Sequence, residues 1–534
     1  MRLPKLLSLT LRTLTACAGI IEPPQPIVQV ATNREPIAGQ AESQTALAIE
    51  RVHQLNPSLN AVIALDPSAI DQARRIDELG ISGPLVGRAV LIKDNIDTVG
   101  SLPTTAGSLA LVKNVTNRDA PLVARLRSEG AVILGKTNLS EWANIRSHAS
   151  ISGWSAVGGQ VRNPYALDRN PCGSSSGSAS AVAAGMVRLA IGTETDGSIT
   201  CPAAINGIVG LKPTVGLVSR THIVPISHSQ DTAGPMTASV REAAELLTAI
   251  AGSDPADAAT VEANNRKVDY AALIDANSLN GKRIGVMRFA SGFGTDPAFE
   301  TALAILRERG AILVEIKKFD DSAIGANELK VLLTEFKAEV VKYLQGSPAP
   351  IDARTLADLI AFNKAHLQAE MALFGQDAFE LAEKTKGLDD PAYKRARVTS
   401  FQAAGRNGID RLLRENNVVA LVGPTMPPAW KIDAVNGDQI AGGGAGSLAA
   451  VAGYPHLTVP MGLVKGLPVG LSFIGPKWSD PLLLSLGFAF EQARGPFPSP
   501  RFYQSIEESP AIAPYLQPTR AAEKSVDTPD ATER

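Results

Sequence analysis

The chain of 534 residues is 45% hydrophobic and 19% charged, so it is long enough to bury a large core and is not disordered as a whole. Its formal net charge of -2 gives no electrostatic reason to expect nucleic acid or an anionic membrane surface as a partner. Three cysteines are too few for a disulfide framework, and no Cys-x-x-Cys pair is present to bind a metal. Cys172 and Cys201 could pair, but we expect them to be two small buried thiols.

The first residues have the order of charge and hydrophobicity that is typical of an export signal. A basic start, MRLPK, precedes an apolar run and a stretch of small residues, and this predicts a leader over residues 1–25. The sequence around Cys17 resembles a bacterial lipobox, which would place a lipid anchor there, although Arg12 interrupts the apolar run. We expect an exported protein, periplasmic or secreted; a cytoplasmic protein is the alternative. No other stretch has the apolar length of a membrane-spanning helix.

After a proline-containing linker at 26–40, the periodicity of apolar residues predicts alternating helices and strands. We expect Asn56-Pro57 to end the first helix and Asp119 to cap the third. The expected elements in chain order are helices at 41–55 and 69–79, a strand at 89–92, a helix at 119–130, a strand at 131–134, a helix at 178–184, a strand at 187–191, a loop-strand segment at 207–218, a helix at 239–251, a strand at 283–287, a helix at 297–309, strands at 311–316, 418–422, 456–460 and 469–474, and a helix at 482–493.

Two segments differ from this alternation. Residues 322–383 contain helical patterns without clear strands, and we expect a helical insert that borders the pocket and helps to select the substrate. Residues 516–534 are polar and contain proline, which predicts a disordered tail. The intervening chain from 41 to 515 is therefore expected to be one large α/β domain with a mixed, twisted central β-sheet covered by helices on both faces.

One nucleotide-binding pattern is present and is interpreted as coincidental. Residues Gly130 to Thr137 match G-x4-G-K-T, the phosphate-binding loop. A true phosphate loop follows a strand and has a flexible turn between its glycines, whereas four apolar, strand-like residues stand here after a predicted helix. A helix end, a buried strand and a turn account for every residue of the match.

Two serine-glycine turns and one lysine indicate the chemistry. Residues 173–177 (GSSSG) and 196–198 (DGS) flank a segment of small residues, and Lys93 follows the buried strand at 89–92. A serine hydroxyl needs a base, and a buried lysine can supply it when desolvation lowers its pKa. We expect Lys93, Ser174 and Ser198 to meet as a serine hydrolase site without histidine. Asp94 would oppose the lowered pKa if its carboxylate pointed toward the lysine.

These motifs resemble the amidase-signature family. The resemblance covers about residues 44–250 and 405–495 and is carried by IKDN at 92–95, GSSSGSA at 173–179, and GTETDGSI at 192–199 with GLKPT at 210–214. Within the family the chain looks most like bacterial peptide amidases, which hydrolyse C-terminal carboxamides of peptides; GKTNLSEWAN and TETDGSITCPAAINGIVGLKPTVGLVSR carry that closer likeness. Cys172, Ser176 and Thr200 depart from the usual family pattern but leave the three catalytic positions intact.

The resemblance implies a role for each matching residue. Ser198 would be the nucleophile, Ser174 the bridging serine that follows a cis peptide bond, and Lys93 the base, with a covalent acyl-enzyme and no metal or organic cofactor. The implied substrate is a small-molecule or peptide amide. The implied oxyanion hole consists of the backbone N–H groups of Thr195, Asp196, Gly197 and Ser198.

Three other functions remain open. Residues 173–177 also fit G-x-S-x-G, which would make Ser175 the nucleophile of a Ser-His-acid esterase of the α/β-hydrolase type, although Asn170-Pro171 argues against the strand such a turn requires. Within the resembling family, an amidotransferase-type subunit would deliver ammonia to a partner. A catalytically inactive binding protein is disfavoured by the intact lysine and serines.

Overall fold

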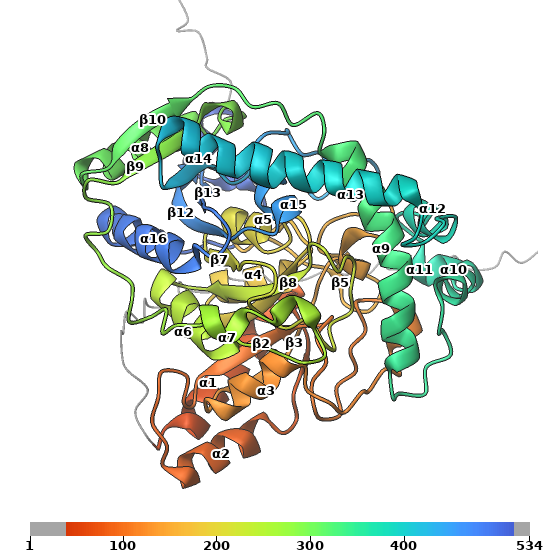
Figure 1. Ribbon diagram of the computed structural model, residues 1–534. Coiled ribbons are helices and arrows are strands. Elements are labelled where there is room, and N and C mark those ends of the chain that lie inside the picture. The colour runs from red at the N-terminus through yellow and green to blue at the C-terminus, as the bar shows by residue number, and fades with distance from the viewer. Residues whose placement is uncertain (1–38, 517–534) are drawn as a thin grey trace, which may run out of the picture. The chain divides into compact units, whose positions relative to one another are not determined.

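The computed structural model describes residues 39–516, and a mixed sheet of eleven strands runs through this part of the chain (Figure 1). The predicted leader, Cys17, nearly all of the predicted linker and the predicted tail after residue 516 lie outside the described residues. A separate two-stranded hairpin is formed by β4 (Trp154–Ser155) and β5 (Gly159–Gln160).

The strands of the large sheet are not arranged in chain order. Their spatial order is β1-β3-β2-β6-β8-β7-β12-β13-β11-β9-β10. Neighbours at β3-β2-β6 and at β11-β9-β10 are parallel, and the other pairs are antiparallel, so the expected mixed sheet is confirmed. The strands are β1 (Val62–Leu65), β2 (Ala89–Lys93), β3 (Val132–Thr137), β6 (Leu189–Glu194), β7 (Val209–Lys212), β8 (Thr232–Thr237), β9 (Arg283–Met287), β10 (Ile312–Ile316), β11 (Ala420–Pro424), β12 (His456–Val464) and β13 (Leu467–Ile474).

Sixteen α-helices accompany these strands in the described residues. They are α1 (Ala41–Leu59), α2 (Ala69–Leu79), α3 (Pro121–Ser128), α4 (Ser176–Ala183), α5 (Thr200–Ile205), α6 (Val240–Ile250), α7 (Ala263–Arg266), α8 (Asp296–Glu308), α9 (Gly325–Gly346), α10 (Leu356–Ala365), α11 (Leu367–Glu370), α12 (Asp377–Glu383), α13 (Pro391–Ala404), α14 (Asp410–Asn416), α15 (Leu448–Ala452) and α16 (Asp480–Arg494).

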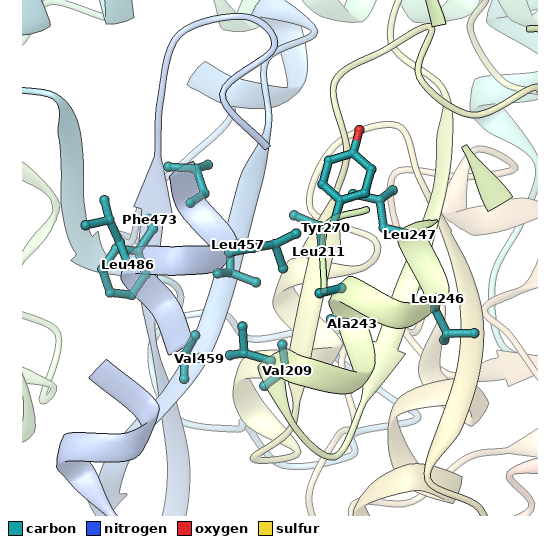
Figure 2. Close-up of a cluster of buried hydrophobic side chains, with 14 of the residues drawn as sticks. Val209, Leu211, Ala243, Leu246, Leu247, Tyr270, Leu457, Val459, Phe473 and Leu486 are labelled. Atoms are coloured by element: carbon teal, nitrogen blue, oxygen red, sulfur yellow. The ribbon is translucent and has the colours of Figure 1, made fainter. Parts of the chain in front are cut away.

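Helices cover both faces of the sheet because side chains alternate along each strand. In β2, Val90 and Ile92 join a core that includes α3, α6, α8 and α16, whereas Leu91 between them joins a second core with α1, α2 and α4. Figure 2 shows the first core between α6 and the strands β7 and β12, where Leu247 and Leu457 are buried. Such apolar burial is the main stabilising term of the fold.

The same alternation decides where the end of β2 points. Lys93 is two residues after Leu91, so its side chain faces α4, and Asp94 begins the turn that follows. Because β2 is parallel to β6, their carboxyl ends lie together, and the chain after β6 enters the loop that carries Ser198. Sites in parallel sheets are commonly built at these strand ends.

Several predicted boundaries were wrong for identifiable reasons. The first helix does not end at Asn56-Pro57 but continues to Leu59, because Pro57 lies in its last turn and Asn60 caps the end in the left-handed region with φ 51. Asp119 does not cap α3; its carboxylate instead accepts hydrogen bonds from the Val99 N–H at 2.7 Å and from Arg127 at 3.0 Å.

The segment predicted as a helical insert contains α9 to α12 and no strand, and Figure 1 shows these helices together, green to cyan, at one side of the view. Phe336 and Phe379 stack inside it with ring centroids 5.1 Å apart. The insert joins the rest of the fold through buried charge: Glu370 accepts hydrogen bonds from Ser108 Oγ at 3.1 Å and lies 3.5 Å from the guanidinium of Arg146.

Candidate active site

Lys93 lies fully buried at the end of β2, surrounded by hydroxyl groups. Its Nζ atom donates hydrogen bonds to Ser174 Oγ at 2.7 Å, to Ser175 Oγ at 3.0 Å and to Thr193 Oγ1 at 2.9 Å. Asn95 extends the group by donating from Nδ2 to Thr193 Oγ1 at 3.0 Å. The structure therefore brings the predicted lysine and one of the two predicted serines into direct contact.

Burial lowers the pKa of Lys93 to about 7, because no carboxylate lies close enough to compensate for the lost solvation; Asp231 and Glu194 oppose the shift only partly. Asp94 does not contribute. Its carboxylate turns toward Thr105 and lies 3.7 Å from the ammonium of Lys136. An amine with a pKa near neutrality can be uncharged and accept a proton at physiological pH, which is what a general base requires.

Ser174 lies just before α4, where its loop comes close to the loop that contains Ser140. The Gly173-Ser174 peptide bond is cis, and the carbonyl of Ser174 accepts a hydrogen bond from the Ser140 N–H at 3.1 Å. A Cβ atom at position 173 would come within 2.0 Å of Ser140 Oγ, so any larger residue there would have to displace the Ser140 side chain. The backbone before α4 is therefore fixed, and with it the hydroxyl that faces Lys93.

The Ser175 side chain is bound to Lys93 and to the backbone of Thr193. Its buried Oγ atom donates to the Thr193 carbonyl at 3.0 Å and accepts from Lys93 Nζ and from the Thr193 N–H at 3.2 Å. No histidine forms a hydrogen bond with Ser175 within residues 39–516. This arrangement does not fit the esterase alternative, in which the hydroxyl of Ser175 would face a histidine and the substrate.

Ser198 lies in the turn between β6 and α5, and 8% of it is exposed. Gly197 has a φ of 77°, a conformation that favours glycine. Glu194 fixes the far side of the turn by accepting hydrogen bonds from the N–H groups of Ile199 at 2.7 Å and Thr200 at 2.9 Å. The Ser198 carbonyl accepts from the Ser175 N–H at 3.1 Å, so the two serine-glycine turns are in contact.

The hydroxyl of Ser198 makes no hydrogen bond to Ser174 among the described residues, so the contact between the turns is through the backbone. Residues 195–198, which we call the oxyanion loop, have no protein acceptor for their four backbone N–H groups in the described chain. The Thr195 hydroxyl donates a hydrogen bond of 2.6 Å to Asp231. Burial raises the pKa of Asp231 to about 6.

A small cavity of about 30 Å³ opens beside these groups and is large enough to hold water. It reaches Thr193 and Thr195 rather than the serine hydroxyls, and its other walls come from the loops around Ala143 and from residues 223–226. Ala143 and its neighbours Trp142 and Asn144 all have positive φ values, which are strained for residues with side chains. No residue of the helical insert lines this cavity; the insert packs behind its walls.

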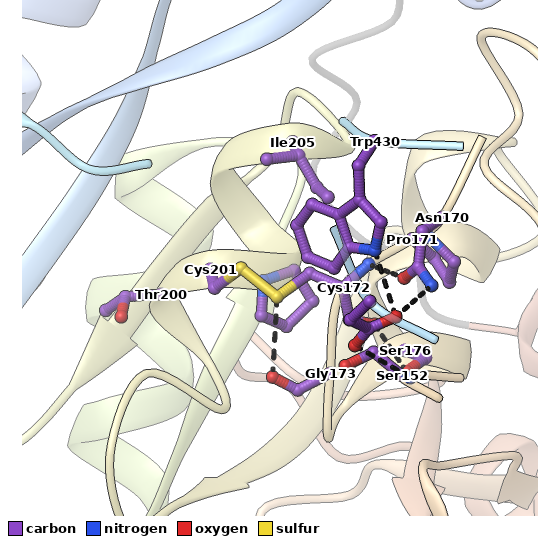
Figure 3. The surroundings of a disulfide bond; sticks show 12 residues. Ser152, Asn170, Pro171, Cys172, Gly173, Ser176, Thr200, Cys201, Ile205 and Trp430 are labelled. Atoms are coloured by element: carbon purple, nitrogen blue, oxygen red, sulfur yellow. Dashed lines mark hydrogen bonds between the residues drawn. A yellow bond between two sulfur atoms is a disulfide. The ribbon is translucent and has the colours of Figure 1, made fainter. Parts of the chain in front are cut away.

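Cys172 and Cys201 form a disulfide, with their Cα atoms 6.1 Å apart, so the expectation of two free thiols was wrong (Figure 3). Their spacing in the sequence says nothing of their distance in space. They meet because the turns holding Ser174 and Ser198 are in contact. Asn206, the residue after α5, also links these segments by donating from its side chain to the Pro171 carbonyl at 2.8 Å. Trp430 packs against the disulfide in the same apolar cluster.

The rejected phosphate-loop pattern has a structural explanation. Gly135, Lys136 and Thr137 are the last residues of β3, and no loop separates the two glycines. Lys136 is buried and donates to the Ile96 carbonyl at 2.6 Å and to Thr104 Oγ1 at 3.0 Å. In residues 39–516 no cluster of three or more His, Cys, Asp or Glu side chains is arranged to hold a metal ion. Within the same residues, no helix is both long enough and apolar enough to cross a membrane.

Sequence reasoning missed three groups that support the site: Thr193, Asn95 and Glu194. Each lies inside a motif that was singled out, IKDN or GTETDGSI, near a predicted catalytic position. Their roles depend on hydrogen-bond geometry, which spacing alone does not show.

The chain is similar to known proteins over most of its length. The family model described as Amidase matches residues 44–484. An Arabidopsis thaliana protein named as a probable amidase is 39% identical over 482 residues, which cover 87% of this chain and 89% of that protein. A glutamyl-tRNA(Gln) amidotransferase subunit from Caldanaerobacter subterraneus is 33% identical over 471 residues, covering 85% and 93% of the two chains.

Solved structures of two peptide amidases are also similar over most of the chain, at a higher sequence identity. The peptide amidase PAM in complex with the competitive inhibitor chymostatin has a TM-score of 0.84 and 51% identity, with 86% of this chain and 96% of that chain covered. Native peptide amidase from Stenotrophomonas maltophilia has a TM-score of 0.82 and 50% identity, with 86% and 95% covered. The similarity therefore spans nearly the whole of each chain and not only the motifs.

Proposed function

Because this chain belongs to the amidase family, we propose that it hydrolyses carboxamides through a Lys93-Ser174-Ser198 relay and a covalent acyl-enzyme on Ser198. That it is an amide-hydrolysing enzyme follows from the family and from the peptide amidase structures. The observation that supports the relay is the 2.7 Å hydrogen bond between the buried Lys93 Nζ and Ser174 Oγ.

The proposed reaction moves one proton back and forth. Ser198 Oγ attacks the carbonyl carbon, its proton passes to Ser174 Oγ, and the proton of Ser174 passes to the neutral amine of Lys93. The oxyanion is stabilised by N–H groups of the oxyanion loop, which have no acceptor of their own in the described chain. The proton then returns through Ser174 to the departing nitrogen, which leaves as ammonia. Water repeats the sequence on the ester and releases the acid.

The proposed substrate is a peptide with a C-terminal carboxamide. The support is the similarity to two peptide amidase structures at 50% and 51% identity, over 86% of this chain. A general aliphatic or aryl amide is the next substrate class.

The deciding assay measures ammonia release from a peptide amide, from the same peptide as a free acid and from a simple aryl amide. We expect release only from the amides, with a higher kcat/KM for the peptide amide. Ser198→Ala should abolish release and also block covalent labelling by a fluorophosphonate, whereas Ser175→Ala should still be labelled. Labelling that persists in Ser198→Ala would contradict the assigned nucleophile.

A second candidate is an ammonia-releasing subunit of an amidotransferase, since one such subunit is 33% identical over 85% of the chain. The two functions differ in the acceptor of the ammonia. Peptide amide hydrolysis by the purified chain alone supports the first function; glutamine hydrolysis that depends on a partner protein supports the second.

We also propose that the protein works in an oxidising compartment after export. The disulfide between Cys172 and Cys201 supports this, because such bonds are rare in reducing cytosol. Cell fractionation with N-terminal sequencing should recover a shortened chain outside the cytoplasm, without free thiols at these two positions. A full-length cytoplasmic chain with both thiols reduced would contradict export. Lipid attachment at Cys17 would appear as an added mass on the mature N-terminus.

A further inference from the structure

Two buried polar atoms beside the small cavity have no hydrogen-bond partner among residues 39–516: the indole nitrogen Trp142 Nε1 and the amide oxygen Asn95 Oδ1. The indole nitrogen can only donate a hydrogen bond, and the amide oxygen can only accept one. Trp142 is 2% exposed and Asn95 is 3% exposed. Because buried polar groups in folded proteins are nearly always hydrogen-bonded, this donor and this acceptor are available to a ligand.

Both residues line a second cavity, of about 10 Å³, that shares Asn95, Ala143 and residues 224–226 with the cavity of about 30 Å³. Of the described residues with an unpartnered buried polar side-chain atom, only Asn95 and Trp142 line these two cavities. Ala143 and Pro225 are half-buried, so the shared walls reach the surface. A carbonyl oxygen is close in size to a water molecule and fits this space.

Asn95 connects this space with the proposed base. Its Nδ2 atom donates to Thr193 Oγ1 at 3.0 Å, and the same hydroxyl accepts from Lys93 Nζ at 2.9 Å. The side-chain nitrogen of Asn95 is therefore occupied, which leaves its oxygen for a ligand. Thr195, the first residue of the oxyanion loop, lines the larger cavity. A group bound here would lie next to the loop that is proposed to hold the scissile carbonyl.

The position of Trp142 is fixed from several sides. Its backbone N–H donates to the Ala106 carbonyl at 2.8 Å, and its ring makes a T-shaped contact with Phe379, from α12 of the helical insert, with ring centroids 5.7 Å apart. Glu141 and Arg146, which flank the strained segment around Trp142, form an ion pair without exposed surface. A positive φ in a residue with a side chain persists only where the surroundings enforce it. The indole is therefore held in place before a ligand binds.

We propose that Trp142 and Asn95 form a subsite for the peptide group that precedes the scissile carboxamide: Trp142 Nε1 donates to the carbonyl oxygen of this group, and Asn95 Oδ1 accepts from its N–H. A peptide group carries one acceptor and one donor, which match the two unpartnered atoms. Successive units of an extended chain are about 3.3 to 3.6 Å apart, so this group lies directly beside the carbonyl that the oxyanion loop would hold. The inference rests on the proposed function and deepens it, because such a subsite distinguishes peptide amides from aliphatic and aryl amides.

Binding to the Ser198→Ala chain tests the subsite without turnover. The two probes are N-acetyl-leucine amide and isocaproamide, which has the same alkyl chain and carboxamide but no peptide group. Trp142→Phe keeps an aromatic ring against Phe379 and removes the donor. In this variant the Kd of N-acetyl-leucine amide should rise about tenfold, since a hydrogen bond is lost and a buried carbonyl is left unpaired, whereas the Kd of isocaproamide should change by less than about twofold.

Trp154→Phe is the matched control, because Trp154 also packs against a phenylalanine of the helical insert, Phe374, with ring centroids 5.2 Å apart, but lines neither cavity. It should leave both Kd values unchanged. An equal rise for both probes in Trp142→Phe would mean that Trp142 only supports packing, and unchanged Kd values would mean that its nitrogen binds water only. Either result, or no measurable binding of N-acetyl-leucine amide, would overturn the subsite.

Kinetics of the chain that retains Ser198 separate this inference from the proposed function. With N-acetyl-leucine amide, Trp142→Phe should raise KM about tenfold and leave kcat nearly unchanged, because the hydrogen bond is made equally in the ground state and in the transition state. If N-acetyl-leucine amide binds selectively through Trp142 but the wild type releases no ammonia from it, the binding subsite stands and the proposed function fails. If ammonia is released but Trp142→Phe affects both amides equally, the proposed function stands and the subsite is overturned.

Discussion

Lys93 Nζ donates a hydrogen bond of 2.7 Å to Ser174 Oγ, and neither side chain has any exposed surface. The pair joins the end of β2 to the turn before α4, two places 81 residues apart in the chain. Its chemistry depends on burial: in water the amine would be an ammonium ion, but here desolvation makes a neutral base accessible near pH 7.

Replacing Lys93 by alanine should lower kcat/KM by about 10² to 10⁴, the usual contribution of a general base. Ammonia release from a peptide amide measures this. Lys113→Ala is a suitable control because that lysine side chain is 70% exposed. Equal turnover of Lys93→Ala and the wild type would rule out the relay.

The pH dependence of kcat/KM should show a rise centred near pH 7. Lys93 must be uncharged to accept a proton, and its pKa is about 7, so the active fraction grows as pH increases through that value. An initial-rate series at pH values below and above 7, in buffers of constant ionic strength, would measure the rise. A rate that decreases across this range would mean that the charged amine is the active form.

Ser174 and Ser175 should respond differently to alanine. Ser174→Ala removes the hydroxyl that passes the proton in the proposed relay and should lower kcat by about 10² to 10⁴. Ser175→Ala removes contacts to Lys93 and Thr193 that fix geometry, so we expect a loss of about tenfold or less. Parallel kcat measurements on the two variants test this, and the reverse ranking would favour the esterase alternative.

Breaking the disulfide should destabilise the fold. The bond closes a loop with a sequence separation of 29, which in the chain-entropy account corresponds to about 3 to 4 kcal/mol of unfolding free energy. Denaturant unfolding of the Cys172→Ala/Cys201→Ala variant would show the decrease, and Cys17→Ala serves as the control. Identical unfolding of the oxidised protein and this variant would show that the bond adds no stability.

Helices and strands with a regular spacing of apolar residues could be predicted from the sequence, because that spacing indicates which side chains are buried. The helix at Ala69–Leu79 and the strand at Arg283–Met287 have the predicted bounds. Strand β8 (Thr232–Thr237) was not predicted, because TAGPMT contains glycine and proline and lacks an alternating pattern. It forms because β6 and β7 lie on either side of it and supply hydrogen-bond partners.

The contact between Lys93 and Ser174 was expected from motif order and resemblance, and the structure has it. The Cys172–Cys201 bond was not predictable in this way. It joins segments whose proximity depends on the three-dimensional fold, and it has no signal in local composition or spacing.

The bond between Cys172 and Cys201 has one more consequence. The covalent ring that it closes contains Ser174, Ser175 and Ser198, together with α4 and β6. A protease that nicks the backbone anywhere inside this ring would leave both ends attached to the same molecule. Under non-reducing conditions such a cut would therefore not separate the proposed nucleophile from its neighbouring serines.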